Sequence, residues 1–378
     1  MRVAVKTANR YDRWEWAGAF GDLGTLIPFV LAYANIVKLD PVGIIFVFGA
    51  AKIAVGLYYR TPVPVQPQKL VGAAATAQAG AFSPEAVWAA GLFSGAVWLL
   101  LGASGAIGLV ARLARKPVTQ GIMLGLGFSF MLEGLRCMQA DWLLAGAGFL
   151  LALFLLGNGK IPAMLALLVL GVTWGVAASP PDWQEVGANV GLHFPRLLLL
   201  HIDDPAAAQG ILLLALPQLP LTLGNAVIGI VAENNMLFPH RRLAEREVAI
   251  STGIINLVAP FWGGVPMCHG AGGMAGHVRF GARTGGALVI LGSLLVVLAL
   301  FFGGAITVLF ALFPRAILGT VLFFAGLELA LTAWRPGEGR SETGIALITA
   351  ALTVWNAGVA FALGIFLAWA TEKGWIRL

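Results

Sequence analysis

PVPVQPQK at residues 62–69 and VPMCHGAGG at residues 265–273 are proline-containing stretches, each leading into small residues within an apolar segment. Proline fixes φ and lacks a backbone donor, so each stretch predicts a short strand that becomes a helix inside the membrane. A helix that begins there presents free N–H groups and the positive end of its dipole. Two such helix starts, facing each other from two related halves, predict a site for an anion.

The composition is that of a membrane protein. Of the 378 residues, 59% are hydrophobic and 11% are charged, whereas soluble domains carry about 25% charged residues. The net charge of +6 is explained by basic cytoplasmic loops, so we expect no nucleic-acid partner. Residues 1–13 lack an apolar core and a cleavage site, which predicts no removable signal peptide.

About fourteen apolar segments, most of them near the length that crosses a bilayer, are separated by Gly, Pro and charge breaks. The last two form one apolar run broken at residues 356–358, which predicts a shallow hairpin or, as an alternative, one long helix. The segments lie near residues 17–35, 41–59, 63–80, 85–103, 117–135, 142–157, 161–178, 209–232, 247–262, 265–279, 285–303, 314–333, 342–356 and 357–372.

An internal repeat divides these segments into two sets of seven. The motif at 62–69 recurs at 265–273, and Gly21-Asp22 recurs at Gly224-Asn225. An odd number of segments per repeat inverts the second copy in the membrane. We therefore expect an all-α polytopic fold whose first repeat spans residues 1–178, followed by an extracytoplasmic connection over 179–208 and a second repeat over 209–378.

The distribution of basic residues sets the expected orientation. With the N-terminus inside, most of the 24 Lys and Arg residues fall in loops on the inner side, so both termini are predicted to be cytoplasmic. Lys52 and Lys69 lie within apolar segments. The basic residues predicted on the outer side are Lys38, Arg136, Arg196 and Arg315.

Hydrogen-bond donors dominate the two predicted helix starts, where a sodium or amine site would require carboxylates. Glycines there let a ligand approach the backbone. The candidate residues are Gln66, Gln68, Lys69, Cys268, His269, Gly270, Ala271 and Gly272. Three alternatives stay open: the glycines serve close helix packing, Lys69 reaches toward the interface, and His269 is a satisfied core histidine.

The segments at 17–35 and 209–232 carry the other intramembrane polar groups, which are functional candidates by default. Thr25, Gln218, Thr222 and Asn225 complete the predicted substrate site. A carboxylate repels an anion unless it is protonated. Asp22 is therefore expected either to couple a proton to transport or, as the favoured alternative, to cap a broken helix.

Enzyme motifs are absent from the sequence. It contains no HExxH, no G-x-S-x-G, no Walker lysine motif and no dinucleotide fingerprint. Cys137 and Cys268 show no metal-ligand spacing. We expect no catalytic activity, no cofactor and no metal, and transport that uses an existing gradient or is passive.

Four motifs in order resemble the molybdate transporter family related to SulP sulfate transporters: GDLGT at 21–25, PVPVQPQK at 62–69, QLPLTLGN at 218–225 and PMCHGAGG at 266–273. The resemblance implies the uracil-permease and SulP type of fold, with fourteen segments in a seven-plus-seven inverted repeat. It also implies that core segments 1–4 and 8–11 move against gate segments 5–7 and 12–14, with the site between segments 1, 3, 8 and 10. Because the chain ends at Leu378, soon after its last predicted span, no C-terminal STAS domain is expected.

One departure from the family pattern is Met123, which stands where the pattern has a polar glutamine. A role for segment 5 in the site is therefore left open.

The sequence thus favours a multi-pass secondary transporter of the inner cell membrane, which carries a tetrahedral oxyanion by alternating access. Molybdate as the substrate comes from the resemblance. A sulfate or tungstate transporter, a nucleobase symporter of the same fold and an anion channel stay open as alternatives. Protons as the coupling ion and a homodimeric assembly are open as well.

Overall fold

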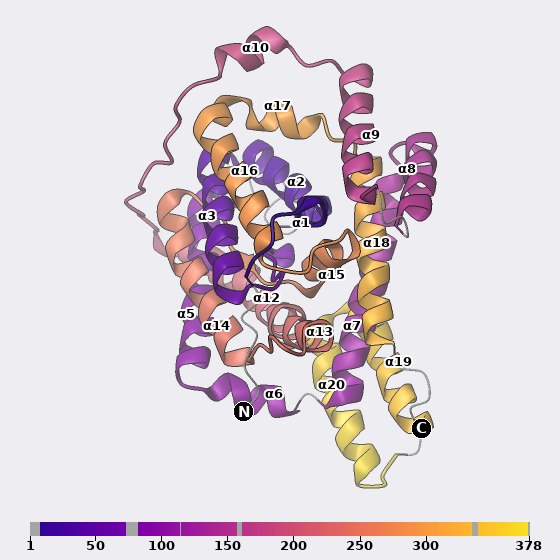
Figure 1. Ribbon diagram of the computed structural model, residues 1–378. Helices are drawn as coiled ribbons and strands as arrows, with labels where there is room; N and C mark the ends of the chain where they lie inside the picture. The colour runs from indigo at the N-terminus through magenta and orange to yellow at the C-terminus, as the bar shows by residue number, and fades with distance from the viewer. Residues whose placement is uncertain (1–7, 73–81, 114, 157–160, 335–338, 377–378) are drawn as a thin grey trace.

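The computed structural model describes residues 8–72, 82–113, 115–156, 161–334 and 339–376, most of which are helical (Figure 1). The first half contains α1 (Arg13–Ala19), α2 (Leu23–Ala32), a π-helical turn (Tyr33–Val37), α3 (Pro41–Tyr59), β1 (Gln66–Pro67), α5 (Pro84–Ala103), α6 (Ala106–Leu113), α7 (Lys116–Met138), α8 (Trp142–Leu155), α9 (Ala163–Ala178) and α10 (Trp183–Ala188).

The second half begins with one long helical stretch that contains two π-helical parts. This stretch consists of α11 (Asp204–Gln209), a π-helical part (Gly210–Ala215), α12 (Leu216–Leu221), a second π-helical part (Thr222–Gly229) and α13 (Ile230–Leu237). The rest of the second half contains α14 (Glu245–Val258), a 3-10 turn (Ala259–Trp262), β2 (Met267–Cys268), α15 (Ala271–Arg279), α16 (Gly286–Phe302), a 3-10 turn (Gly303–Ala305), α17 (Ile306–Ala311), α18 (Arg315–Ala333), α19 (Arg340–Trp355) and α20 (Ala357–Glu372).

Within the described residues, 7 helical stretches are long and apolar enough to cross a membrane. Shorter apolar helices lie at Trp142–Leu155, Ala163–Ala178 and Val359–Glu372. The polytopic helical architecture expected from the sequence is confirmed. The long-helix alternative for the last two segments is wrong, because α19 and α20 are separate helices that meet at Asn356 and pack against each other.

The helices form two groups with a central set between them. Figure 1 shows α3, α5, α14 and α16 on one side and α7, α8, α9 and α18 on the other. The first helices, α1 and α2, lie between these groups together with α13 and α15. The connection that carries α10 lies at one end of the molecule, and α6 and α20 lie toward the other end.

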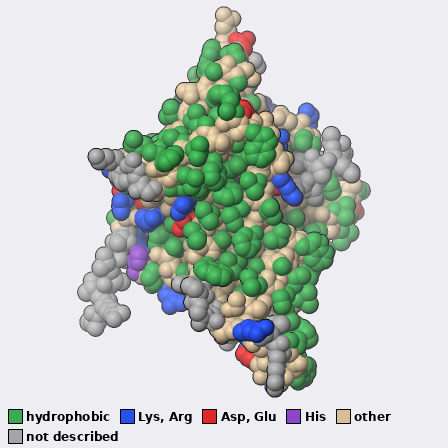
Figure 2. All heavy atoms as spheres, turned by 90° about the vertical axis from the view of Figure 1, so that its right-hand side faces the viewer, with side chains coloured by type: hydrophobic (Ala, Val, Ile, Leu, Met, Phe, Trp, Pro, Cys, Tyr) green, Lys and Arg blue, Asp and Glu red, His purple; other side chains and the backbone are tan. Residues whose placement is uncertain are grey.

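The outer surface is apolar over large areas. Figure 2 shows hydrophobic side chains covering most of the centre of one face. Large apolar side chains such as Phe128, Phe154 and Leu331 are 43%, 78% and 56% exposed. A large exposed apolar surface of this kind is typical of a protein in contact with lipid.

A two-stranded antiparallel sheet joins the two halves of the chain. Gln66 of β1 pairs with Cys268 of β2, and Pro67 pairs with Met267. Each strand leads directly into helix, because residues 69–72 are helical and α15 begins shortly after β2. The two proline-containing stretches that opened the sequence argument therefore lie side by side.

Side chains and flanking backbone complete the hydrogen bonding of this sheet. The N–H of Gln68 donates to the carbonyl oxygen of Pro266 at 2.8 Å. On the far side of β2, the amide of Asn256 donates to the Met267 carbonyl at 2.7 Å, and its oxygen accepts from the Met267 N–H at 2.8 Å. Non-helical chain in a membrane protein is tolerated where it is buried in protein and satisfied in this way.

Helices from the two halves approach closely at paired glycines. A Cβ atom on Gly49 of α3 would lie 2.7 Å from the carbonyl oxygen of Gly292 of α16. A Cβ atom on Gly127 of α7 would likewise lie 2.7 Å from the carbonyl oxygen of Gly326 of α18. Neither site leaves room for a side chain, so these glycines set the spacing of both helix pairs, as small residues do in membrane bundles.

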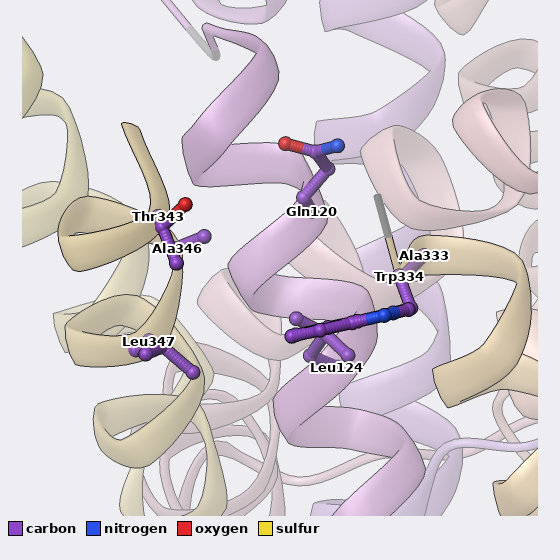
Figure 3. Close-up of a pocket in the computed structure, with 7 residues that line it drawn as sticks. All are labelled: Gln120, Leu124, Ala333, Trp334, Thr343, Ala346 and Leu347. Carbon is purple, nitrogen blue, oxygen red and sulfur yellow. The ribbon is translucent and has the colours of Figure 1, made fainter. Parts of the chain in front are cut away.

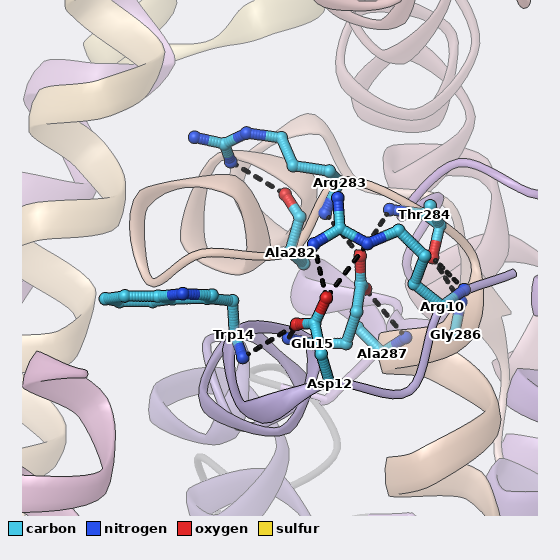
Figure 4. A network of polar contacts seen from close by, with 9 residues as sticks. All are labelled: Arg10, Asp12, Trp14, Glu15, Ala282, Arg283, Thr284, Gly286 and Ala287. Carbon is cyan, nitrogen blue, oxygen red and sulfur yellow. Dashed lines mark hydrogen bonds and ion pairs between the residues drawn. The ribbon is translucent and has the colours of Figure 1, made fainter. Parts of the chain in front are cut away.

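Glu15 of α1 caps α16 from the opposite half (Figure 4). Its carboxylate accepts hydrogen bonds from the N–H groups of Arg283 and Thr284, both at 3.0 Å, and from that of Ala287 at 3.2 Å. Glu15 is buried, and α16 has no side-chain cap of its own at Gly285. An anionic group is favourable at this end of the helix dipole, so Glu15 fastens α1 to the start of α16.

We expect Glu15→Ala to lower the midpoint of thermal unfolding in detergent by several degrees. The variant leaves three N–H groups without their acceptor, and each buried unsatisfied group costs about 1–3 kcal/mol. The control is Asp204→Ala, which removes an exposed acid from the first turn of α11 and should leave the midpoint unchanged. A wild-type midpoint for Glu15→Ala would show that this cap does not hold α1 against α16.

Candidate anion-binding site

Gln66 and Asn225 connect the two strand-to-helix junctions to neighbouring helices. The amide of Gln66 donates to Thr25 Oγ1 at 2.7 Å, and Asn225 Oδ1 accepts from the N–H of Ala271 at 3.1 Å. A Cβ atom on Gly270 would lie 2.7 Å from Gln66 Oε1. All of these side chains are buried, so the structure brings five of the predicted site residues together.

Gln68 and Gln218 are held in the same region. The amide of Gln68 donates to Ser94 Oγ at 3.1 Å. Gln218 Oε1 accepts from the N–H of Leu70 at 2.8 Å, and its amide donates to Thr222 Oγ1 at 2.9 Å. The helical stretch from α11 to α13 therefore contacts both helix starts, through Gln218 at residue 70 and through Asn225 at residue 271.

Lys69 and Gly272 face the same aromatic ring. Lys69 Nζ is buried, has no hydrogen-bond partner among the described residues, and lies 3.4 Å from the centre of the Phe130 ring. Any side chain at Gly272 would collide with this ring. Phe130 of α7 therefore fills the space between the two helix starts, and its ring face stabilises the ammonium group.

His269 is fully engaged within the protein. Its Nδ1 lies 2.8 Å from the carbonyl oxygen of Pro64 and its Nε2 lies 2.8 Å from Ser251 Oγ. A carbonyl oxygen only accepts, so Nδ1 donates to Pro64 and the neutral Nε2 accepts from Ser251. This is the satisfied histidine considered as an alternative. Cys268 is buried within β2.

Asp22 has a partner that the sequence argument missed. Asp22 lies at the N-cap position of α2, but its side chain makes no capping hydrogen bond. Its Oδ2 is instead 2.6 Å from Lys52 Nζ of α3 and 3.5 Å from His277 Nε2 of α15, and none of the three side chains is exposed to solvent. His277 Nδ1 donates to the carbonyl oxygen of Gly18 at 2.7 Å.

Only part of this cluster carried a sequence signal. Lys52 and Asp22 are opposite charges within apolar segments, and intramembrane ionisable residues usually pair with one another. That rule could have predicted the Asp22–Lys52 pair from the sequence. His277, eight residues beyond His269 in a glycine-rich helix, and the aromatic Phe130 carried no comparable signal.

One large cavity adjoins these residues. It has a volume of about 530 Å³ and is bounded by Thr25 and Phe29 of α2, by Lys69, by Phe130 of α7 and by Arg315 of α18, among others. Figure 3 shows a second pocket, between α7, α18 and α19, whose volume is only about 20 Å³. The small pocket holds about one water molecule, whereas the large cavity has room for an oxyanion and adjoins the two helix starts through Lys69.

Comparison with protein families now places the chain. A family model described as "Molybdate transporter of MFS superfamily" matches residues 14–130 and 210–329, one block in each half. The chain belongs to this molybdate transporter family. The family is one of transporters, so the expectation that the chain is no enzyme is confirmed.

Curated relatives of this molybdate transporter family member match nearly its whole length. Molybdate transporter 2 of Arabidopsis thaliana is 31% identical over 93% of this chain and 85% of the relative. Molybdate transporter 1 of the same plant is 29% identical over 93% of this chain and 86% of the relative. Molybdate transporter 1 of Chlamydomonas reinhardtii is 28% identical over 93% of this chain and 90% of the relative.

Solved structures of anion transporters share the fold. The transmembrane domain of the cyanobacterial bicarbonate transporter BicA matches with a TM-score of 0.58 and 17% identity, over 94% of this chain and 99% of that one. The murine anion transporter Slc26a9 in an inward-facing state matches with a TM-score of 0.65 and 12% identity, over 98% of this chain and 70% of that one. The SulP-type fold expected for the molybdate transporter family member is confirmed at the level of overall architecture.

The Asp22–Lys52 pair makes a prediction for single and double variants. Lys52→Met removes the cation nearest to the buried Asp22 carboxylate and leaves it only His277, and breaking a buried pair costs about 3–5 kcal/mol. We expect this variant to express poorly and to unfold at lower temperature. The double variant Asp22→Asn with Lys52→Met removes both charges and should recover most of the lost stability.

Uptake by the double variant separates two roles of Asp22. If Asp22 acts only by pairing with Lys52, the double variant transports with the pH dependence of the unmodified protein. Loss of that pH dependence in a stable double variant would assign proton coupling to Asp22. A double variant no more stable than Lys52→Met would contradict the pairing itself.

Proposed function

We propose that this protein is a secondary transporter that carries molybdate across the inner membrane by alternating access. The antiparallel pairing of β1 with β2 carries the proposal, because it brings the helix starts at residues 69 and 271 together. The ammonium of Lys69 beside them, which has no hydrogen-bond partner among the described residues, supplies positive charge. Molybdate itself is favoured by the family and by the curated relatives.

The proposed binding site surrounds the position now filled by the Phe130 ring. The proposed binding residues on the first-repeat side are Thr25, Gln66, Gln68 and Lys69; Lys69 Nζ is the donor among them that bonds to none of the described residues. On the second-repeat side they are Gln218, Thr222, Asn225, Cys268, and the backbone of Gly270, Ala271 and Gly272, with His269 positioning β2 through its bonds to Pro64 and Ser251. For the anion to reach Gly272, the Phe130 ring must move away. This agrees with the gating role that the resemblance implies for segment 5, which contains α7, and it proposes a place for that segment beside the site, which Met123 had left open.

We further propose fourteen segments in two inverted repeats, over residues 1–178 and 209–378, with broken helices after β1 and β2. Helix packing supports this division. The α3–α16 contact at Gly49 and Gly292 has a counterpart in α5 and α14, where a Cβ on Gly95 would lie 3.0 Å from the Gly253 carbonyl oxygen. In the proposed inverted repeat, segment 2 corresponds to segment 9 and segment 11 corresponds to segment 4. The contact of α3 with α16 is therefore equivalent to the contact of α14 with α5.

The proposed orientation places α10 outside the cell and both termini in the cytoplasm. Moving one charge against the membrane potential costs about 2.3 kcal/mol per 100 mV, so importing a dianion costs roughly twice that amount. Co-transported positive charge would offset this cost. Protons are the proposed coupling ion, and Asp22 with His277 is the proposed place for one.

Uptake into proteoliposomes tests the proposal. We expect saturable molybdate uptake that a pH gradient accelerates. Tungstate and sulfate should compete with molybdate, each according to its own affinity for the site, and uracil should not compete. Lys69→Met should lower the initial rate at least about thirtyfold, since the loss of a buried charged partner costs several kcal/mol. Lys38→Met, the same change at an exposed lysine, is the control and should transport normally.

Three outcomes would contradict the proposal. Uptake that does not saturate with molybdate would indicate a channel. Strong binding of sulfate with no uptake of molybdate would indicate that sulfate, and not molybdate, is the substrate. Full activity of Lys69→Met would remove the proposed site from the pathway.

A further inference from the structure

The large cavity lies between α2 on one side and the α7–α18 pair on the other. Its wall from α7 includes Glu133 and Cys137, near the end of that helix, and its wall from α18 includes Arg315, the first residue of that helix. Both helix ends lie toward the end of the molecule that carries α10 (Figure 1). The cavity therefore extends from the proposed site toward the proposed outer surface.

Two cations mark this cavity, one exposed and one buried. The Arg315 side chain is exposed and forms no hydrogen bond or ion pair with any described residue. Lys69 Nζ is buried. The difference in exposure assigns Arg315 to the mouth and Lys69 to the interior.

The acidic group on the cavity wall has a cationic partner of its own. Glu133 Oε2 lies 3.1 Å from Arg136 Nη1 on the same helix. The charged residues that line the cavity are Lys69, Glu133 and Arg315. Of these, Lys69 and Arg315 form no ion pair with any described residue. The rest of the lining is mainly apolar, which strengthens the field of the cations inside.

We propose that Arg315 is an entry site that captures a divalent oxyanion at the mouth of this cavity, before the anion reaches Lys69 and the Phe130 ring. The proposal deepens the transport function and rests on it. Its physical basis is long-range attraction: a low-dielectric cleft lined by one sign of charge raises the local concentration of the opposite ion. Salt weakens such attraction when the charge is exposed.

Cys137 offers a reporter that does not depend on transport. It is half-buried, lines the cavity, and is one of only two cysteines in the chain; the other, Cys268, is buried. We would measure modification of Cys137 by mass spectrometry with an anionic reagent, 2-sulfonatoethyl methanethiosulfonate, and a cationic one, 2-(trimethylammonium)ethyl methanethiosulfonate. Each rate is normalised to that of a free thiol.

We expect the anionic reagent to be favoured at Cys137, and Arg315→Gln to reduce the anionic-to-cationic rate ratio by about threefold or more. Millimolar molybdate should slow the anionic reagent in the unmodified protein. The control, Arg196→Gln, removes an exposed cation from the α10-bearing connection that does not line the cavity, and should keep the ratio. An unchanged ratio in Arg315→Gln would overturn the proposal.

Uptake kinetics give the second readout. We expect Arg315→Gln to raise the KM for molybdate about three- to tenfold with little change in maximal rate, and Arg315→Lys to stay close to the unmodified protein. Raising the ionic strength should shrink the difference between Arg315→Gln and the unmodified protein. A KM effect that salt does not alter, or an equal loss in Arg315→Lys, would indicate a structural role and overturn the entry site.

The two proposals fail separately. If the thiol reagents show an anion-attracting mouth that depends on Arg315 but molybdate is not taken up, the entry site stands and the proposed substrate fails. If molybdate uptake is normal while Arg315→Gln changes neither the reagent ratio nor KM, transport stands and the entry site fails.

Discussion

The pairing of β1 with β2 is the contact on which the rest of the site depends. Only two residues from each strand pair, yet the pairing brings stretches from opposite halves of the chain together and sets where the following helices begin. Extended backbone is costly in a membrane protein unless every polar group finds a partner. Asn256 and His269 bond to these stretches, through Met267 and Pro64, and so supply part of that satisfaction.

Buried charge is handled in two different ways around this sheet. Asp22 and Lys52 neutralise each other inside the protein, with His277 beside them. Lys69 has no such partner in the described part of the chain and lies against an aromatic ring. An ammonium without an anion in a buried place is costly, and a bound oxyanion would supply the missing charge. The contrast separates a pair that contributes to structure from a cation available to a ligand.

The helix pairs are tightly packed, whereas a cavity lies beside them. The glycine contacts of α3 with α16 and of α7 with α18 are close enough to fix each pair. The large cavity instead lies between part of α2 and the α7–α18 pair, and the Phe130 ring of α7 lies against Lys69. Movement of one group against the other would open or close this space without disturbing the tight pairs.

The sequence by itself determined the membrane class, the bounds of most helices and the pair of proline-containing strands, because apolar runs and proline act locally. It also indicated most of the candidate polar residues, since the motifs at 21–25, 62–69, 218–225 and 265–273 carry them. Only the tertiary structure decided their partners: that Asp22 bonds Lys52 and makes no cap, that His269 is satisfied, and that Phe130 fills the space between the helix starts. These outcomes depend on distances between segments far apart in the chain, and no local pattern of residues encodes those distances.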